Sequence, residues 1–248
     1  MRRSAILLSA LTTCLAAGVD AADLRVLSTA AVQVPVTETA EQFMRETGNR
    51  VTFEFATAGQ VDEKLATGAR PDVVINSSGR IAARTSANPA DAAAVRELGT
   101  VRIGVAARKG AARPDLSSAA RFRDALVRAE SITYGDPARG ATTGIHFSRI
   151  IDQLDLRSIL AGKTILAANG LDVVQKVARG EAELGITQVS EILHVDASTL
   201  VGPLPDALQL ATTYVAWTPD PANRAARELV DALTAKQGRE RFRAAGFD

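Results

Sequence analysis

The sequence contains few of the residues on which metal, thiol or nucleic-acid chemistry depends. Its 248 residues include two His and one Cys, too few for a Cys/His zinc site, a CxxC redox pair or a disulfide framework. Aromatic residues make up only 4% of the chain, which argues against stacking surfaces for single-stranded nucleic acid. With 29 basic and 28 acidic residues, the chain has no excess charge to hold a polyanion. We therefore expect no metal, no cofactor and no nucleic-acid partner.

Recognisable catalytic motifs are also missing from the sequence. It contains no G-x-S-x-G elbow, no H-E-x-x-H, no P-loop and no glycine-rich dinucleotide fingerprint. The sequence therefore predicts a binding protein and not an enzyme. Scattered Asp and Glu residues leave an acid–base pair, and with it hydrolytic or lyase activity, as the alternative.

The first 21 residues have the pattern of a secretory signal peptide. Arg2 and Arg3 precede an apolar run over 5–17 that is too short to span a bilayer, and a small-residue exit follows up to Ala21. Cleavage there removes two of the 29 basic and one of the 28 acidic residues, which leaves a neutral, cysteine-free chain suited to an oxidising compartment. We expect a periplasmic protein, with a lipoprotein anchored at Cys14 as the alternative.

From residue 24 onward, short β-branched runs alternate with amphipathic helical patterns, which is typical of an α/β fold with a mainly parallel sheet. The pattern predicts strands at 24–27, 51–55, 72–75, 101–106, 131–134, 164–166, 184–187 and 208–217. Apolar residues at helical spacing predict helices around Val36, Phe122 and Phe147, and a late helix over 222–235. Ser117 or Ser118 can cap the helix around Phe122.

Two similar turns follow predicted strands and open predicted helices. They are Ala56-Thr57-Ala58-Gly59 and Ala141-Thr142-Thr143-Gly144, and Thr142 or Thr143 can cap the second helix. The first N–H groups of a helix lack intrahelical acceptors and the helix dipole adds partial positive charge there, so each turn can hold an anion. If the turns belong to different lobes, they can close on one small anion. The alternative is that each is only a well-capped helix start.

A series of short segments follows in a recognisable order along the chain. The segments are 24–31, 43–48, 55–59, 68–75, 110–115, 135–137, 140–147, 185–186, 202–205 and 245–247. In this order and spacing they resemble the periplasmic substrate-binding proteins of ABC importers, in particular the molybdate-binding-protein-like group. The resemblance implies an α/β, two-lobed periplasmic-binding-protein fold with two crossing segments, mixed and mainly parallel sheets, and a ligand held in the cleft between the lobes.

The resemblance also implies how the chain is divided and what it does. It places the signal peptide at 1–21, the first part of lobe 1 at 22–103, lobe 2 at 104–208 and a return to lobe 1 at 209–248. The crossings are expected near 101–107 and 208–217. The protein is expected to be a monomer that captures a small anion and delivers it to an ABC permease in the inner membrane.

The turns and the resemblance together predict the residues that bind the ligand. These are Thr29, Ala30, Ala31, Thr57, Ala58, Gly59, Thr142, Thr143, Gly144 and Gln188. The resemblance implies a molybdate or tungstate type of oxyanion, but Ala31 and Ala58 stand where molybdate binders carry serine, and Gln188 stands where they carry tyrosine. Each missing neutral hydroxyl removes a hydrogen bond worth about 1 kcal/mol. A small organic acid whose carbon skeleton fits over the two alanines is the alternative, feeding a permease or a membrane signalling receptor.

Other residues near the turns offer different predictions. Arg80 and Arg139 could pair with a carboxylate ligand, which would make the site a charge clamp. His146 is expected to pack or cap within its helix. Gly144 is expected to lie at an exposed turn, where a bulky replacement would block the ligand with little effect on folding.

Overall fold

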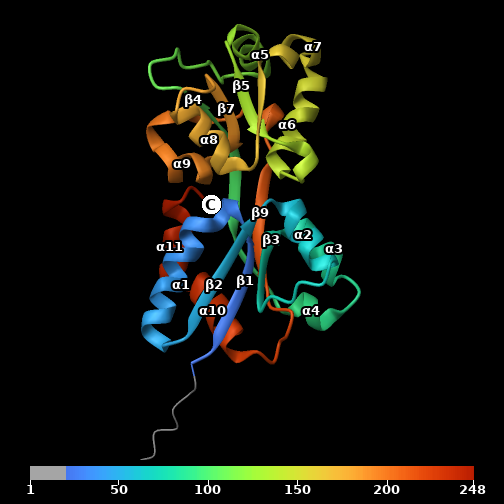
Figure 1. Cartoon of the computed structure of the whole chain (residues 1–248), viewed down its shortest axis with the longest axis vertical. Helices are drawn as coiled ribbons and strands as arrows, with labels where there is room; N and C mark the ends of the chain where they lie inside the picture. The colour runs from blue at the N-terminus through green and yellow to red at the C-terminus, as the bar shows by residue number, and fades with distance from the viewer. Residues whose placement is uncertain (1–20) are drawn as a thin grey trace, which may run out of the picture.

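The computed structural model describes residues 21–248, and the predicted signal peptide up to residue 20 lies outside the described residues, as does Cys14. Two α/β lobes are stacked along the long axis of the molecule and connected at a narrow waist by the strands β4 (Val95–Ala107) and β9 (Ala211–Trp217) (Figure 1). Across residues 21–248, no helix combines the length and the apolar character that a membrane span requires. The predicted two-lobed α/β fold is confirmed.

The lower lobe in Figure 1 is built on a mixed sheet. Its strands β1 (Asp23–Thr29), β2 (Arg50–Ala56) and β3 (Val73–Ser77) are parallel, with β1 between the other two, and β9 pairs antiparallel with β3 and β4. The helices of this lobe are α1 (Gln33–Thr47), α2 (Ala58–Ala66), α3 (Ser78–Thr85), α4 (Pro89–Ala93), α10 (Arg224–Thr234) and α11 (Lys236–Ala244). The end of the chain therefore returns to the lobe in which β1 begins.

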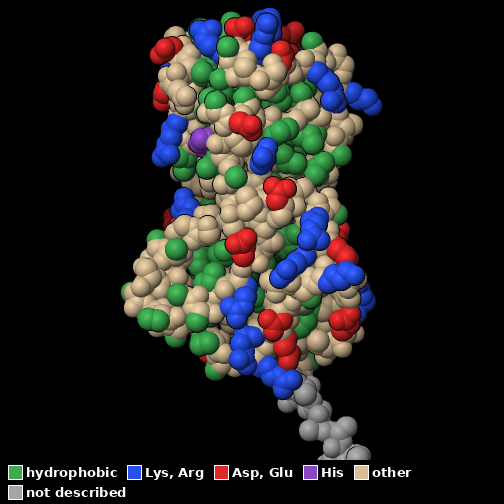
Figure 2. Space-filling view, turned by 180° about the vertical axis from the view of Figure 1, so that it is seen from behind, with side chains coloured by type: hydrophobic (Ala, Val, Ile, Leu, Met, Phe, Trp, Pro, Cys, Tyr) green, Lys and Arg blue, Asp and Glu red, His purple; other side chains and the backbone are tan. Residues whose placement is uncertain are grey.

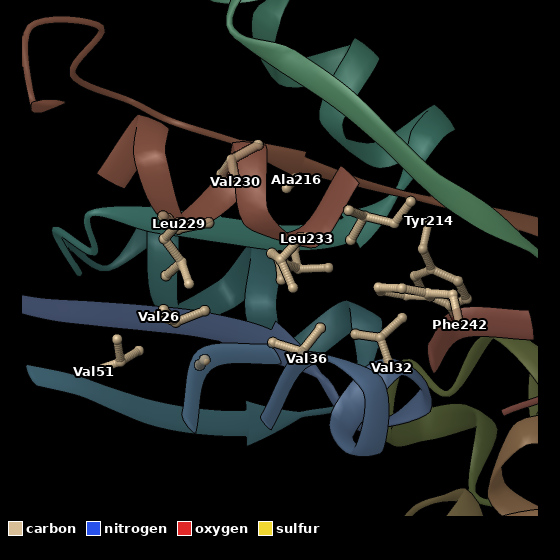
Figure 3. Close-up of a cluster of buried hydrophobic side chains, with 14 of the residues drawn as sticks. Val26, Val32, Val36, Val51, Tyr214, Ala216, Leu229, Val230, Leu233 and Phe242 are labelled. Atoms are coloured by element: carbon tan, nitrogen blue, oxygen red, sulfur yellow. The ribbon is translucent and has the colours of Figure 1, made fainter. Parts of the chain in front are cut away.

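The core of this lobe is formed by residues from both ends of the chain. Val26 and Val36 pack with Leu229, Leu233 and Phe242, which lie on α10 and α11 (Figure 3). Burying an aliphatic or aromatic side chain of this size contributes about 1.5–3 kcal/mol. The two C-terminal helices thus help to hold the first strands, and with them the turns that follow those strands.

The upper lobe has its own sheet and core. Strand β5 (Ile132–Gly135) lies between β6 (Thr164–Ala167) and β7 (Leu184–Gln188) and is parallel to both, while the second half of β4 pairs antiparallel with β7 and β8 (Leu200–Pro203). The helices are α5 (Ala119–Arg128), α6 (Thr142–Gln153), α7 (Arg157–Leu160), α8 (Gly170–Ala178) and α9 (Val189–Asp196). Phe147 of α6 packs edge-on against Tyr134, with 5.1 Å between the ring centroids, and thereby fixes α6 on the sheet.

Strand β4 belongs to both lobes. Its first part, through Arg102, pairs with β9, and from Ile103 onward it pairs with β7. At this change the side chain of Gln209 accepts a hydrogen bond from the Ile103 N–H at 2.8 Å and donates one to the Ile103 carbonyl at 3.0 Å. This pair joins the two connecting segments at the waist.

The predicted strands all form, with three differences. Strand β4 begins at Val95, well before the predicted residue 101, because pairing with β9 extends it through a polar segment. Residues 208–210 were predicted as part of the last strand but precede β9. Strand β8 was not predicted. Ser118 caps α5 by accepting from the Arg121 N–H at 3.2 Å. The prediction that Thr142 or Thr143 caps α6 is wrong, because Ala141 is the N-cap residue and no side chain caps this helix.

Candidate functional site

A cavity lies between the lobes where several helices begin. Its volume is about 40 Å³, room for a few water-sized groups. The residues that line it are Thr29, Ala30, Ala31, Ala56, Thr57, Ala58, Ala141, Thr142, Thr143, Asn169, Gly170, Gln188, Glu191 and Tyr214. The structure thus brings together all the predicted ligand-binding residues except Gly59 and Gly144. We call this space the interlobe cavity.

The two glycine-containing turns meet beside the interlobe cavity. The Gly59 N–H donates to the carbonyl of Gly140 at 3.1 Å, and the Thr57 hydroxyl donates to the carbonyl of Arg139 at 2.5 Å. A Cβ atom at Gly59 would lie 2.7 Å from the Cα atom of Gly140, closer than non-bonded carbons approach. The lobes are therefore in contact in this conformation, and only glycine allows the contact.

Helix N-termini supply the positive potential around the interlobe cavity. Helices α2, α6 and α8 begin at Ala58, Thr142 and Gly170, and all three residues line the wall. No Lys or Arg is among the lining residues of the described chain. Because dipoles and unpaired N–H groups favour anions at helix starts, the wall can stabilise a negative charge without a basic side chain.

Two threonine hydroxyls in the wall are free to bind a ligand. Thr29 is 3% exposed at the end of β1, and its Oγ1 has no hydrogen-bond partner within residues 21–248. The Oγ1 atom of Thr142 is also buried and unpartnered, which follows from the missing cap on α6. The hydroxyl of Thr57, in contrast, accepts from the Gln60 N–H at 3.3 Å and donates across the lobes. Buried polar groups normally find partners, so the hydroxyls of Thr29 and Thr142 point to a ligand.

A glutamine and a tyrosine connect the lobes at the interlobe cavity. Gln188, at the end of β7, donates from Nε2 to the Tyr214 hydroxyl at 2.8 Å and accepts from it through Oε1 at 3.1 Å. Burial raises the pKa of the Tyr214 phenol, so this hydroxyl stays protonated at neutral pH. Gln188 was among the predicted ligand-binding residues, and Tyr214 was not.

Glu191 is a further residue of the wall that the sequence analysis missed. It lies in the first turn of α9, and its Oε2 atom accepts hydrogen bonds from the Thr187 hydroxyl and from the Gln188 N–H, the latter at 3.2 Å. Burial raises the pKa of this carboxyl group above its ordinary value. The only sequence signal was a Glu three residues after the end of a strand, which is also the ordinary spacing of a capping residue.

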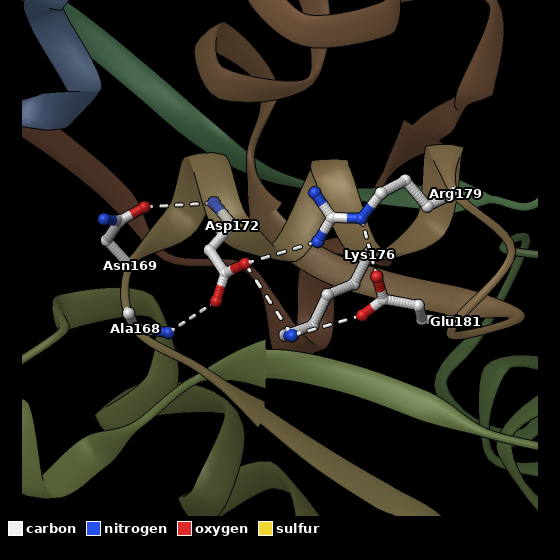
Figure 4. A network of polar contacts seen from close by, with 6 residues as sticks. All are labelled: Ala168, Asn169, Asp172, Lys176, Arg179 and Glu181. Carbon is white, nitrogen blue, oxygen red and sulfur yellow. Dashed lines mark hydrogen bonds and ion pairs between the residues drawn. The ribbon is translucent and has the colours of Figure 1, made fainter.

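The start of α8 is held in place by a polar network (Figure 4). The Asn169 side chain accepts from the Asp172 N–H at 3.0 Å, and the Asp172 carboxylate accepts from the Ala168 N–H at 2.9 Å and lies 3.8 Å from the ammonium group of Lys176. Lys176 and Arg179 in turn contact Glu181. These contacts fix Asn169 and Gly170 in the cavity wall.

The basic residues considered as a charge clamp do not reach the interlobe cavity. Arg80 pairs with Asp62, and Arg139 is exposed. On the face in Figure 2, basic and acidic side chains are interspersed, with no field of one sign. His146 contacts the backbone, with Nε2 2.9 Å from the Leu208 carbonyl oxygen.

The environment of Gly144 differs from the exposed turn that the sequence predicted. Gly144 is buried, and a Cβ atom there would lie 1.8 Å from the carbonyl oxygen of Gly135. The expectation of an exposed turn that tolerates a bulky residue is therefore wrong, because α6 begins directly against the end of β5. Gly144 lets the helix approach the strand, and the neighbouring Thr142 and Thr143 reach the cavity.

Replacing Thr29 with valine tests whether its hydroxyl serves a ligand. We expect Thr29→Val to leave the stability of the ligand-free protein unchanged or to raise it by about 1 kcal/mol, because an unpaired buried hydroxyl becomes a methyl group. Affinity for the ligand should fall about tenfold, the equivalent of about 1.4 kcal/mol. Thr133→Val is the matched control, since Thr133 is a buried strand residue with an unpartnered hydroxyl outside the interlobe cavity. Urea unfolding and titration calorimetry measure both quantities, and equal affinity losses in the two variants would contradict the assignment.

Comparisons with known proteins agree with this architecture. Aconitate isomerase from Pseudomonas sp is 30% identical over 236 residues, which cover 90% of this chain and 87% of that protein. The structure of the periplasmic molybdate-binding protein of Azotobacter vinelandii is 17% identical, with a TM-score of 0.68 over 91% of this chain and 98% of the other. PEB3 of Campylobacter jejuni with bound L-phospholactate is 16% identical, with a TM-score of 0.65 over 91% and 99% of the two chains. Residues 24–248 match the family described as bacterial extracellular solute-binding protein, and the chain belongs to this family.

Proposed function

We propose that this protein binds a small organic carboxylate in the periplasm, encloses it between its lobes and delivers it to an ABC permease. The observation that carries the proposal is the composition of the interlobe cavity, in which five alanines alternate with hydroxyl and amide groups. A tetrahedral oxyanion presents oxygen in every direction and needs a hydrogen bond for each. An organic acid presents carboxylate oxygens to polar groups and carbon to methyl groups.

The carboxyl group of Glu191 is compatible with an anionic ligand of either class only when it carries a proton. An ionised carboxylate in the wall repels any anion at short range, and low polarity strengthens that repulsion. Burial raises the pKa of Glu191, which favours the protonated form. The aconitate named for the Pseudomonas relative is an unsaturated tricarboxylate, which supports a ligand of this class. A molybdate-type oxyanion is the alternative.

The lobes contact each other beside the interlobe cavity, so a ligand enters when they separate. The Gly59 N–H to Gly140 carbonyl bond joins the two lobes, and we infer that entry requires opening at this contact and that closure on the ligand restores it. Such opening and closure about connecting strands is a known mode of domain motion. The proposed role is therefore that of a hinged receptor whose closed form presents both lobes to the permease.

A thermal-shift screen of residues 22–248 tests the proposal. Probes are cis-aconitate, trans-aconitate, citrate, malate and phospholactate, compared with molybdate, tungstate and sulfate. A ligand at 100 times its Kd adds about 2.7 kcal/mol of stability, which raises the Tm of a chain of this size by about 5–10 °C. We expect such a shift with at least one carboxylate. Stabilisation by molybdate or tungstate alone would show that the site takes an inorganic oxyanion.

A further inference from the structure

A second and larger cavity lies at the end of the lower lobe that faces away from the interlobe cavity. Its volume is about 490 Å³, which is within the range of small-molecule sites. Thr29, at the carboxyl end of β1, lines the interlobe cavity, whereas Arg25, near the start of β1, lines the second cavity. The strand between them spans about 13 Å, and it runs from the free end of the lobe toward the waist (Figure 1). We call this second space the distal cavity.

The distal cavity combines an apolar wall with three arginines. Its apolar lining includes Leu65, Trp217 and Pro219, and its arginines are Arg25, Arg70 and Arg84. The arginines come from β1, from the loop before β3 and from the last turn of α3, so the fold brings together segments that are separate in the sequence. An indole and a pyrrolidine ring offer flat apolar surfaces against which another ring can pack. Few charged groups in a mostly apolar pocket are typical of a ligand site.

Two of the three arginines are available to a ligand. Arg70 and Arg84 are exposed, and neither forms an ion pair within residues 21–248. Arg70 donates only to the carbonyl of its neighbour Ala69, at 3.2 Å. Arg25, in contrast, donates to the Arg70 carbonyl at 2.6 Å, and its Nε lies 3.9 Å from the carboxylate of Asp72. Arg25 therefore supports the backbone of the loop, and the guanidinium groups of Arg70 and Arg84 are left to bind an anion.

Two carboxylates also line the distal cavity, and the protein itself occupies both. Asp72 accepts from the Arg25 N–H at 2.8 Å and from the Asn223 side chain at 3.0 Å, and Asp220 accepts from the Ala222 N–H at 2.9 Å. The C-terminal ends of α2 and α3 add negative partial charge here. The arginines outweigh these contributions by a single charge, so the distal cavity suits an anion with one acidic group and not a polyanion.

The only tryptophan of the chain is part of the apolar wall. Trp217 ends β9 and is 9% exposed, and its indole N–H has no hydrogen-bond partner within residues 21–248. A buried indole N–H usually has a partner, so the wall of the distal cavity lacks an acceptor that a bound molecule can provide. A single tryptophan in this wall also makes the fluorescence of the protein a local measure of whether the distal cavity is occupied.

We propose that the distal cavity is a second ligand site, separate from the interlobe cavity, and that it binds a small aromatic carboxylic acid. The ring of the ligand packs against Trp217 and Pro219, and its carboxylate pairs with Arg70 and Arg84. Guanidinium groups bind carboxylates through two parallel hydrogen bonds, which orients the acid as well as holding it. All residues that line the distal cavity belong to the lower lobe, so this site needs no closure of the lobes.

Titration of the purified protein with 3-phenylpropionate tests the proposal. Trp217 fluorescence and calorimetry should both show saturable binding, with one molecule bound per chain. The amide of the same shape, 3-phenylpropanamide, should bind at least about tenfold more weakly, because it cannot form charge-assisted bonds to the arginines. Acetate carries the acidic group without the ring and should leave the fluorescence unchanged at the same concentration. Equal affinity for the acid and the amide, or no saturable binding of the acid, would overturn the proposal.

Arginine variants show where the probe binds. Arg84→Ala should lower the affinity for 3-phenylpropionate about tenfold, and Arg70→Ala should act in the same direction. Arg128→Ala is the matched control and should keep the wild-type affinity, since Arg128 is an exposed arginine in the last turn of α5, as Arg84 is in the last turn of α3. Undiminished affinity in both distal-cavity variants would place the probe elsewhere and overturn the assignment. None of these results decides the ligand of the interlobe cavity, which the carboxylate screen tests by itself.

Discussion

Replacing Gly59 with valine should abolish tight ligand binding without unfolding the protein. The contact between Gly59 and Gly140 is backbone against backbone, and even a Cβ atom at Gly59 would lie 2.7 Å from the Cα atom of Gly140. Valine would hold the lobes apart and remove the N–H bond to the Gly140 carbonyl, which is 3.1 Å long. A ligand held by one lobe loses the donors of the other, and we expect an affinity loss of at least about 100-fold, or about 2.7 kcal/mol.

Gly79→Val is the matched control for this prediction. Gly79 lies in the first turn of α3, as Gly59 does in α2, and a Cβ atom there meets no atom within 4 Å. Both variants replace a glycine with valine at the second position of a helix, so any change in helix propensity is the same in the two. Small-angle scattering with the best carboxylate from the screen should show a decrease in radius of gyration for wild type and Gly79→Val only. Closure of Gly59→Val at the same ligand concentration would refute this account of the contact.

Much of the fold could be predicted from the sequence because its signals are local. Buried parallel strands are short β-branched runs, and 72–75 and 184–187 were recognisable as such. The early part of β4 was not, because 95–100 contains polar residues and becomes a strand only by pairing with β9. That pairing joins segments more than a hundred residues apart. The hydrophobic periodicity within either segment does not predict this pairing.

The candidate site was predictable to the extent that it is made of helix starts. Except for Gly59 and Gly144, the residues of the two similar turns reach the interlobe cavity together with Thr29 and Gln188, because the carboxyl ends of the strands lie there. Glu191 was missed because a glutamate in the first turn of a helix is most simply a capping residue. Its importance comes from burial and from the approach of Gly170, which belongs to a different helix. Such properties arise from packing and have no pattern in the sequence.

Replacing Gly144 with alanine should destabilise the upper lobe strongly, although the side chain added is the smallest possible. The new Cβ atom would lie 1.8 Å from the Gly135 carbonyl oxygen and 2.7 Å from its carbon, so α6 would have to move away from β5 and loosen the contact of Phe147 with Tyr134. Overpacking of this kind costs about 3 kcal/mol, which lowers the Tm by about 6–12 °C in a chain of this size. The control Gly79→Ala has open space and should match or exceed wild-type stability, since alanine favours helix by about 0.5–1 kcal/mol. Differential scanning calorimetry on both variants measures the difference in Tm. A Gly144→Ala protein with the Tm of the wild type would show that α6 can shift freely. The position of Thr142 in the interlobe cavity would then not be fixed by the packing of α6 against β5.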